Sequence, residues 1–540
     1  MKNNILSDKK FLFPRLYPME WFCLFCGVVF SFYYAWIMDD AYVYFRYVDN
    51  FVFLHRGLVY NPGEYVEGFS SPLWMLFLIL IRSLHLNYWL AIRLIAVCSY
   101  AVFWALAVIV NRKLSEGRPE PYIVNYPLIN LTFTYGVLCY FSSGLETPLV
   151  QIAAVAYACY FLFPGSVALQ LIIALSPLIR PELFLPFLIA FVWYIVARKR
   201  FPFNLLLFSC VSLGAWLIFR IYYYADLFPN TFYLKDVIDI KQGLCYIYDT
   251  GSAYYTLPIL LLFFSLYLFI RRNNKEFNLN TQARVMMIIA ASLVALYVVK
   301  IGGDARHFRY LAFSYCLLIV STGGILERVL TILQLQAHRR LIFSIALSLA
   351  LFSFMCYPRQ LLYHPILKVK GKLFQYRQFL KINDAALHRN QLFLTPPLLS
   401  SGKEIELMPE MEYFVKTKRT ISSSSVLTNL RCEEAYKKFD YFVIHDLGLT
   451  EPFLARTRMY PDRPAHKLGL IPLAQDILRV RLKYGFQKSS FQSAVDAGDA
   501  PIWVQNNLDT IKLIEEKAYN DHNFSRNLKL IIKRVKEIKP

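Results

Sequence analysis

The chain has 540 residues, of which 57% are apolar and only 18% are charged, whereas soluble globular proteins are about one quarter charged. This composition excludes a disordered chain and a small disulfide-stapled secreted protein, and it argues against an ordinary soluble enzyme. The net charge is +21, but the Lys and Arg residues cluster between apolar runs, as the positive-inside rule requires of a membrane protein. We therefore predict a protein of the lipid bilayer with no nucleic-acid partner.

The first apolar run is Trp21–Met38, which is long enough for a membrane helix. Basic residues precede it, and Asp39-Asp40 follows it where a signal peptide would have a small-residue cleavage site. The pattern predicts an uncleaved signal anchor whose N-terminus is cytoplasmic. On this interpretation the two carboxylates stand at the C-terminal end of a helix, where the helix dipole disfavours negative charge.

Eleven further apolar runs follow, at Pro72–Leu86, Trp89–Val110, Tyr122–Phe141, Leu149–Phe163, Val167–Ile179, Leu183–Val196, Asn204–Phe219, Tyr254–Ile270, Val285–Ile301, Tyr310–Leu326 and Leu341–Cys356. The run Pro72–Leu86 is short and contains Arg82 and His85, which is typical of an interfacial or re-entrant segment. If it does not cross, the basic clusters near Arg112, Arg198 and the later loops all become cytoplasmic. We therefore predict a fold of about eleven transmembrane helices with the C-terminus outside.

The predicted domains are a transmembrane domain over residues 1–357, with an outer loop at 39–71, and a soluble extracytoplasmic domain over 358–540. The tail is polar and basic, and it is long enough for a domain of its own. Tyr441–Ile444 is typical of a short buried strand, and Leu508–Glu516 and Asn527–Ile538 have helical periodicity. These patterns predict a mixed α/β domain. Cys23 and Cys26 lie inside an apolar run, so we interpret them as packing residues.

The most informative motif is Asp39-Asp40, because carboxylates are costly beside lipid. Arg46 follows about two helical turns after Asp39, so a proton-accepting carboxylate and a phosphate-binding cation could share one helix face. The alternative is a solvated helix end. Glu67 lies in a later tight segment of the same outer loop, where its simplest interpretation is a surface carboxylate.

Several polar motifs occur in a fixed order along the predicted outer segments. They are Asp39–Tyr47, Gly57–Trp74, Ser143–Thr147, Arg180–Glu182, Tyr224–Lys235, Gly302–Asp304 with Arg309, Gly448–Arg456 and His466-Lys467. The ordered set resembles the GT-C class of membrane glycosyltransferases, and within it the mycobacterial-type terminal arabinofuranosyltransferases and their bacterial relatives. Two departures bear on the sugar and the acceptor: Arg56 stands where that family has a histidine, and Ala465 precedes His466 where it has glycine.

The resemblance implies a GT-C-type enzyme of the bacterial inner membrane that uses a sugar carried on a polyprenyl phosphate, arabinofuranose or another pentose or hexose. The acceptor would be a cell-envelope glycan, such as a cell-wall polymer or a lipopolysaccharide, on the outer face of that membrane, with the C-terminal domain periplasmic. Such chemistry needs a carboxylate at the acceptor hydroxyl or the anomeric centre, and cations at the departing phosphate.

We assign Asp39 or Asp40 to the carboxylate role. The expected substrate- and phosphate-binding residues are Arg46, Arg56, Glu67, Glu146, Arg180, Lys235, Asp304 and Arg309, with Asp304 and Glu146 orienting the cations. A divalent metal on Asp39 and Asp40 is an open alternative, although no His or Cys set accompanies them, and no other cofactor is expected. Arg180, Lys235 and Arg309 could instead be interfacial anchors.

Two other function classes stay open at this point. A lipid-glycan transporter or flippase would need charged or broken spans at the membrane midplane and two similar halves, and neither is evident in the sequence. A non-enzymatic envelope scaffold would leave the outer-loop carboxylates unexplained.

Overall fold

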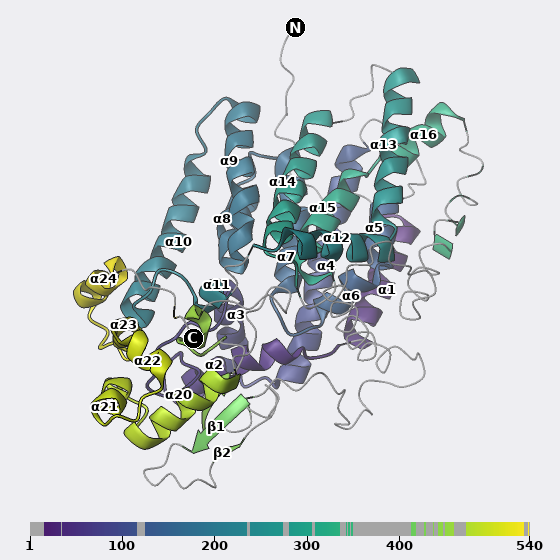
Figure 1. The fold of residues 1–540 in the computed structure, drawn as a ribbon. Helices are drawn as coiled ribbons and strands as arrows, with labels where there is room; N and C mark the ends of the chain where they lie inside the picture. The colour runs from purple at the N-terminus through teal and green to yellow at the C-terminus, as the bar shows by residue number, and fades with distance from the viewer. Residues whose placement is uncertain are drawn as a thin grey trace.

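The computed structural model describes residues 16–33, 35–115, 125–234, 238–273, 280–304, 308–334, a few positions between 338 and 348, and then 412–416, 426–427, 436, 441–445, 449–457, 471–533 and 538. The described part is mostly helical (Figure 1). Up to residue 334 its elements are α1 (Pro18–Tyr33), α2 (Asp39–Val52), α3 (Pro72–Ser83), α4 (Tyr88–Leu114), α5 (Tyr126–Thr132), α6 (Tyr135–Phe141), α7 (Thr147–Leu162), α8 (Val167–Ile179), η1 (Pro181–Leu183), α9 (Phe184–Arg198), α10 (Phe203–Tyr224), α11 (Asn230–Leu234), α12 (Ile240–Ala253), α13 (Thr256–Asn273), α14 (Thr281–Lys300), η2 (Arg309–Leu311), α15 (Ala312–Ser321) and α16 (Ile325–Ile332).

Among the described residues, six helical segments are long and apolar enough to cross a membrane: α4, η1 with α9, α10, α13, α14, and η2 with α15 and α16. Shorter apolar helices are α1, α3, α7 and α8. A bilayer core takes about 20 apolar residues per helix. The chain is therefore a multi-pass helical membrane protein, as predicted.

The basic loops of the sequence gather at one end of the helix bundle. Asn280, just before α14, donates from its amide to the Lys113 carbonyl at the end of α4 (3.1 Å). Tyr267 near the end of α13 shares a hydrogen bond with Thr281 at the start of α14 (3.0 Å). The opposite end carries α2, α3, α11 and the C-terminal elements (Figure 1).

The first apolar run is interrupted, which corrects the expectation of one helix over Trp21–Met38. The helix α1 ends at Tyr33, residues 35–38 belong to no helix, and the Met38 backbone is extended. There the Trp36 and Met38 N–H groups donate to the carbonyls of Ser142 (3.1 Å) and Ser143 (2.9 Å). A second helix, α2, then begins at Asp39. The Asp39-Asp40 pair therefore opens a helix, at the end where the dipole favours negative charge.

The short helix α3 begins and ends beside α2. Just before α3, Gly68 N–H donates to the Tyr47 hydroxyl of α2 (2.9 Å). In the last turn of α3, Arg82 donates to Asp49 of α2 (2.8 Å). With 12 residues the helix is only about 18 Å long. Both of its ends therefore lie at the end of the bundle that carries α2.

The C-terminal part contains a sheet and a group of short helices. Strand β1 (Glu412–Lys416) pairs antiparallel with β2 (Val426–Leu427) and β3 (Tyr441–His445), in the order β2-β1-β3, with Tyr413 opposite Ile444. The helices are η6 (Leu454–Arg456), α20 (Ile471–Tyr484), α21 (Ser490–Asp496), α22 (Ile502–Asn506), α23 (Leu508–Ala518) and α24 (Phe524–Ile532). Phe453, Ile477, Phe491 and Ile511 belong to an apolar core of this part. The helix expected at Asn527–Ile538 begins earlier, at Phe524, and ends at Ile532.

Candidate active site

The backbone pairing of residues 36–38 with 142–143 places the first turn of α2 beside the start of α7. Gly144 makes this approach possible, because its φ is +76° and an added Cβ would lie 3.2 Å from the Ala41 Cβ. Glu146 occupies the position directly before α7, although its side chain makes no capping hydrogen bond. Asp40 and Glu146 thus stand at neighbouring helix N-termini, where positive helix ends favour carboxylates.

Arg309 lies at the centre of a cluster of buried charges. Its Nη1 donates to Asp40 Oδ2 (2.9 Å), and its Nη2 donates to Glu146 Oε1 (3.3 Å). Asp304 Oδ2 lies 3.8 Å from the same Nη1. These carboxylates come from α2, the start of α7 and the loop after α14, so this end of the bundle converges on one guanidinium.

A second guanidinium, that of Arg180, lies on the other side of Glu146. Its Nε is 2.9 Å from Glu182 Oε1 and 3.8 Å from Glu146 Oε1. It stacks over the Tyr310 ring at 4.0 Å. Burial lowers the pKa of Arg180, but the charges of Glu182 and its other acidic neighbours more than reverse this, so the pKa is raised and the group stays cationic.

Tyr44 also faces the cluster, one helical turn after Asp40 on α2. Burial raises the pKa of its phenol, the Glu146 charge raises it further, and Arg309 and hydrogen bonding with Ser70 oppose these effects. A residue four positions along a helix lies on the same face, which explains why Asp40 and Tyr44 share this site.

The members of the cluster differ in their access to water. Glu146 and Asp304 are buried, whereas the Asp40 side chain is 30% exposed. Two buried atoms, Glu146 Oε2 and Arg309 Nε, make no hydrogen bond to any described residue. Such atoms cost free energy unless a water or a ligand pairs with them. Asp40 is therefore exposed to solvent beside Arg309 and Glu146, each of which has a polar atom without a hydrogen bond to the described residues.

An aromatic wall adjoins Arg309 in the chain. Phe308 has a φ of +67°, a conformation that a bulky side chain rarely adopts. Its buried ring packs against Tyr140, Tyr254 and Tyr315. Backbone strain of this kind persists where the surrounding structure enforces it, and it concentrates at functional sites.

Of the residues that the sequence predicted, Asp40, Glu146, Arg180, Asp304 and Arg309 meet in this cluster. Arg46 is fully buried and donates from Nε to the Tyr60 carbonyl (2.9 Å), so it holds the loop after α2. The Arg56 N–H donates to the Asn50 carbonyl at the end of α2 (2.8 Å). Lys235 and the side chain of Asp39 lie outside the described residues, as does His466.

Glu67 forms a buried two-point ion pair with Arg220 of α10, one contact of which, Nη2 to Oε1, is 3.0 Å. Burial raises the pKa of Glu67, and Arg220 opposes the rise. This pairing ties the loop 53–71 to α10 rather than to the Arg309 cluster, so the surface-carboxylate interpretation of Glu67 is wrong.

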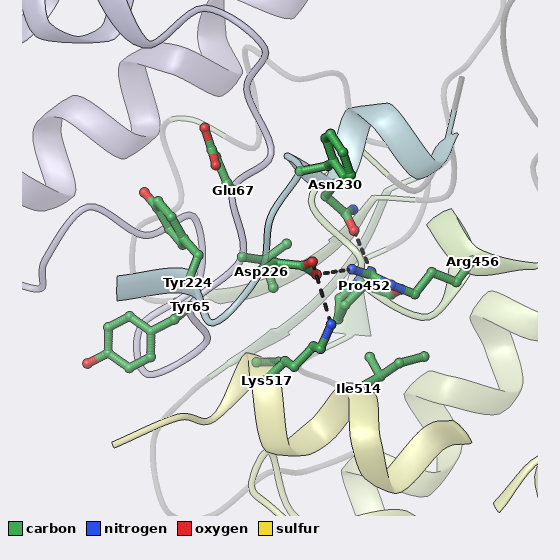
Figure 2. A pocket seen from close by; sticks show the side chains of 12 residues that line it. Tyr65, Glu67, Tyr224, Asp226, Asn230, Pro452, Arg456, Ile514 and Lys517 are labelled. Carbon is green, nitrogen blue, oxygen red and sulfur yellow. Dashed lines mark hydrogen bonds and ion pairs between the residues drawn. The ribbon is translucent and has the colours of Figure 1, made fainter. Parts of the chain in front are cut away.

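The later motifs join the loop 53–71 to the C-terminal part. Asn230 N–H donates to the Glu67 carbonyl (2.8 Å), and Arg456 donates to Asn230 Oδ1 (2.8 Å) and Asp226 Oδ2 (2.7 Å). Lys517 lies 3.5 Å from Asp226, and Figure 2 shows both cations directed at this carboxylate. The cavity they line measures about 20 Å³, room for about one water molecule. This cavity is therefore too small to hold a sugar.

A second joint forms around Arg481 of α20. The Asn61 side chain makes two hydrogen bonds to the backbone of Val443 in β3 (2.8 and 2.9 Å). Nearby, Glu64 pairs with Arg481 at 3.0 Å, with both side chains buried. Burial raises the pKa of the neighbouring Glu451 to about 8, against the charge of Arg481. The Asn-Pro-Gly-Glu turn thus docks the loop 53–71 against β3 and α20 of the C-terminal part.

No group of three or more His, Cys, Asp or Glu in the described part of the chain is placed to hold a metal ion. The described carboxylates of the cluster face guanidinium groups instead. A metal held by Asp39 and Asp40 stays a prediction, because only one of these two side chains is described.

Sequence reasoning missed Tyr44, Glu182 and Tyr310 as members of the cluster. Glu182 stands in the Arg-Pro-Glu motif, and Tyr310 directly follows Arg309, so adjacency to a predicted cation is the signal that could have found them. Tyr44 could have been found by its spacing of one helical turn from Asp40.

A terminal beta-(1->2)-arabinofuranosyltransferase of Corynebacterium glutamicum is 26% identical to this chain over 325 residues, a match that covers 51% of this chain and 46% of that protein. The chain therefore spans about half the length of the curated relative it matches. No family model matches the chain, and no solved structure matches it. The match supports a distant relation to a glycosyltransferase.

Proposed function

We propose that the chain is a GT-C-type glycosyltransferase that moves a sugar from a polyprenyl-phosphate donor to a glycan of the cell envelope. The observation that carries the proposal is the convergence of Asp40, Glu146 and Asp304 on Arg309 at one end of a membrane bundle. The distant arabinofuranosyltransferase relative supports the same reaction class. The transferred sugar would be arabinofuranose or another pentose or hexose.

In this proposal Asp40, or its neighbour Asp39, takes the proton of the acceptor hydroxyl. Asp40 is suited to that role because it is the partly exposed carboxylate of the described cluster. Arg309 and Arg180 would neutralise the departing lipid phosphate, which a guanidinium binds with a matched fork of donors. Glu146 lies between both guanidinium groups and would fix their orientation.

We further propose eleven membrane passes. The six long segments account for six, and α1, α7 and α8 for three more. The broken pair α5 and α6 supplies another, and the run Leu341–Cys356, most of which lies outside the described residues, supplies the last. The helix α3 is not counted, because both of its ends lie at the end of the bundle that carries α2. The positive-inside rule then puts the Lys113 end in the cytoplasm and the Arg309 cluster on the outer face of a bacterial inner membrane, with the C-terminal part in the periplasm.

The decisive experiment is sugar transfer by the purified full-length chain in lipid nanodiscs, supplied with polyprenyl-phosphate sugars and an envelope glycan acceptor. We expect extension of the glycan that is lost with Asp40→Asn together with Asp39→Asn. The matched control is Asp509→Asn, an exposed carboxylate of α23. Donor crossing the bilayer of a sealed vesicle without any sugar transfer would replace the proposal with a flippase.

A further inference from the structure

The helix α24 presents three different sides. Phe524, Leu528 and Ile532 recur every four residues and so lie on one face, where they are 40%, 43% and 78% exposed. Asn527 and Leu530 form the side buried against the protein. The remaining side carries the exposed cations Arg526 and Lys529, and the exposed Lys533 follows directly after the helix. Arg526 also pairs with Asp521 at 2.8 Å, so the two lysines carry the charge that is free to meet a lipid. An exposed apolar stripe flanked by cations is the pattern of helices that lie in a membrane surface.

The position of α24 is fixed by the end of a membrane helix. Its Asn527 side chain donates to the carbonyls of Ile221 (3.1 Å) and Tyr222 (2.9 Å). Asn520, just before α24, donates to the Tyr223 carbonyl (3.1 Å). These carbonyls belong to the last turn of α10, which has no intrahelical partners for them. The C-terminal part thus caps α10, and Figure 1 shows α24 beside that end of the helix.

The end of α10 is a natural membrane boundary. This helix is a candidate span, and it finishes in three tyrosines, a residue type that concentrates where the bilayer meets water. Ile218 and Tyr222 are exposed on its outer side, and the Tyr222 ring lies 5.6 Å from the His522 ring that precedes α24. The lipid-facing surface of α10 therefore leads directly to α24.

We propose that α24 lies in the headgroup layer of the bilayer, with Phe524, Leu528 and Ile532 inserted and the basic side directed at anionic lipid phosphates. The capping contacts set the height of the helix, and the cations supply charge complementarity to an anionic leaflet. A protein partner or a second copy of the chain would have to displace lipid headgroups from the apolar face of α24, because that face lies at the membrane boundary. The proposal rests on the membrane assignment and does not depend on the catalytic one.

Photo-crosslinking tests the inference on the full-length chain in nanodiscs. A benzophenone amino acid replaces Leu528 in one sample and Asp509, exposed on α23, in the other. We expect lipid adducts from position 528 and few from position 509, read by mass spectrometry. Adducts from 528 to a second copy or to another protein, or no lipid adduct there, would overturn the proposal.

The charge component is tested with nanodiscs of phosphatidylglycerol against phosphatidylcholine. We expect adducts at 528 to favour the anionic lipid, and Lys529→Glu with Lys533→Glu to reduce that preference by about fivefold per cation removed. Lys512→Glu, a lysine of α23, serves as the matched control. An anionic preference that survives the double variant would contradict the basic side's role.

Discussion

Arg309 and Asp40 are 269 positions apart in the chain, yet Arg309 Nη1 donates to Asp40 Oδ2 over 2.9 Å. The contact joins the start of α2 to the start of η2. It places a partly exposed carboxylate against a buried cation. On the proposed function, a base and a phosphate-binding group are therefore held side by side before any substrate arrives.

We predict that Asp40→Asn lowers the rate of sugar transfer by ~100- to 10,000-fold, the usual cost of losing a general base. Asp39→Asn is measured in parallel, and because neighbouring residues on a helix point about 100° apart, the two losses should be unequal. The assay is transfer per folded molecule in nanodiscs. Asp49→Asn at the other end of α2 is the control, since Asp49 pairs with Arg82 and should affect stability rather than rate. Near-normal transfer in the single and combined Asp39 and Asp40 variants would leave the pair as an ordinary helix start.

Arg309→Lys should weaken donor binding although it keeps the positive charge. A single ammonium group cannot reproduce the planar fork that reaches Asp40 and Glu146 together, nor a two-point contact to phosphate. We expect a higher KM for the lipid-linked donor with a smaller change for the acceptor. Arg479→Lys, at an exposed arginine of α20, is the matched control. Unchanged donor affinity would remove Arg309 from the phosphate site.

Glu146→Gln should destabilise the membrane domain. The change keeps the shape of the side chain but leaves two buried guanidinium groups without the carboxylate between them. Removing one partner of a buried ion pair costs about 3–5 kcal/mol. We expect a lower thermal midpoint in detergent, and no comparable change for Glu516→Gln, whose carboxylate is partly exposed on α23. Equal midpoints would show that Glu146 is not the link between Arg180 and Arg309.

The docking of the C-terminal part should weaken as the pH rises. Burial raises the pKa of Glu451 from 4.5 to about 8, so the folded protein keeps this proton where the unfolded chain has lost it. Stability from this group is therefore full below about pH 4.5 and declines until about pH 8. Glu451→Gln should remove that decline, with the variant more stable than the parent at pH 8 to 9. Thermal midpoints measured across this range check it, and parallel curves for the two proteins would contradict it.

Gly68→Ala should loosen the junction between α2 and the C-terminal part. An added Cβ would lie 2.8 Å from the Tyr47 hydroxyl and 2.7 Å from the Thr450 Cγ2. Because Tyr47 shares α2 with Asp40, we expect reduced transfer together with faster proteolysis of the C-terminal part. Gly251→Ala in α12 is the control, since a Cβ there meets open space. If the variant is proteolysed at the parent's rate, close packing at Gly68 does not hold the C-terminal part against α2.

The sequence predicted the membrane class and five members of the cluster, because loops between apolar runs must hold most of the polar residues that can act together. It placed Asp39-Asp40 at the wrong end of a helix. Hydropathy cannot register a helix break when the residues in the break are themselves apolar, and residues 35–38 are Ala, Trp, Ile and Met. The break depends on hydrogen bonds to Ser142 and Ser143, about one hundred residues away.

The sequence could not separate the charges of the Arg309 cluster from the charges that dock the C-terminal part either. Glu67 and Glu146 both look like outer carboxylates, yet one pairs with Arg220 and the other with Arg309 and Arg180. Only the three-dimensional arrangement assigns each carboxylate its partner. Motif order had grouped them into one site because both lie in segments that the resemblance covers.

During synthesis, Glu146 leaves the ribosome before both of its guanidinium partners, Arg180 and Arg309. The ribosome delivers this buried carboxylate early, and its partner Arg309 follows 163 residues later. An acid within a membrane protein is costly until its counter-charge is in place. A nascent chain released before residue 309 would therefore leave Glu146 with only the more distant Arg180, 3.8 Å away, as its counter-charge, a defect by which membrane proteases could distinguish unfinished copies from complete ones.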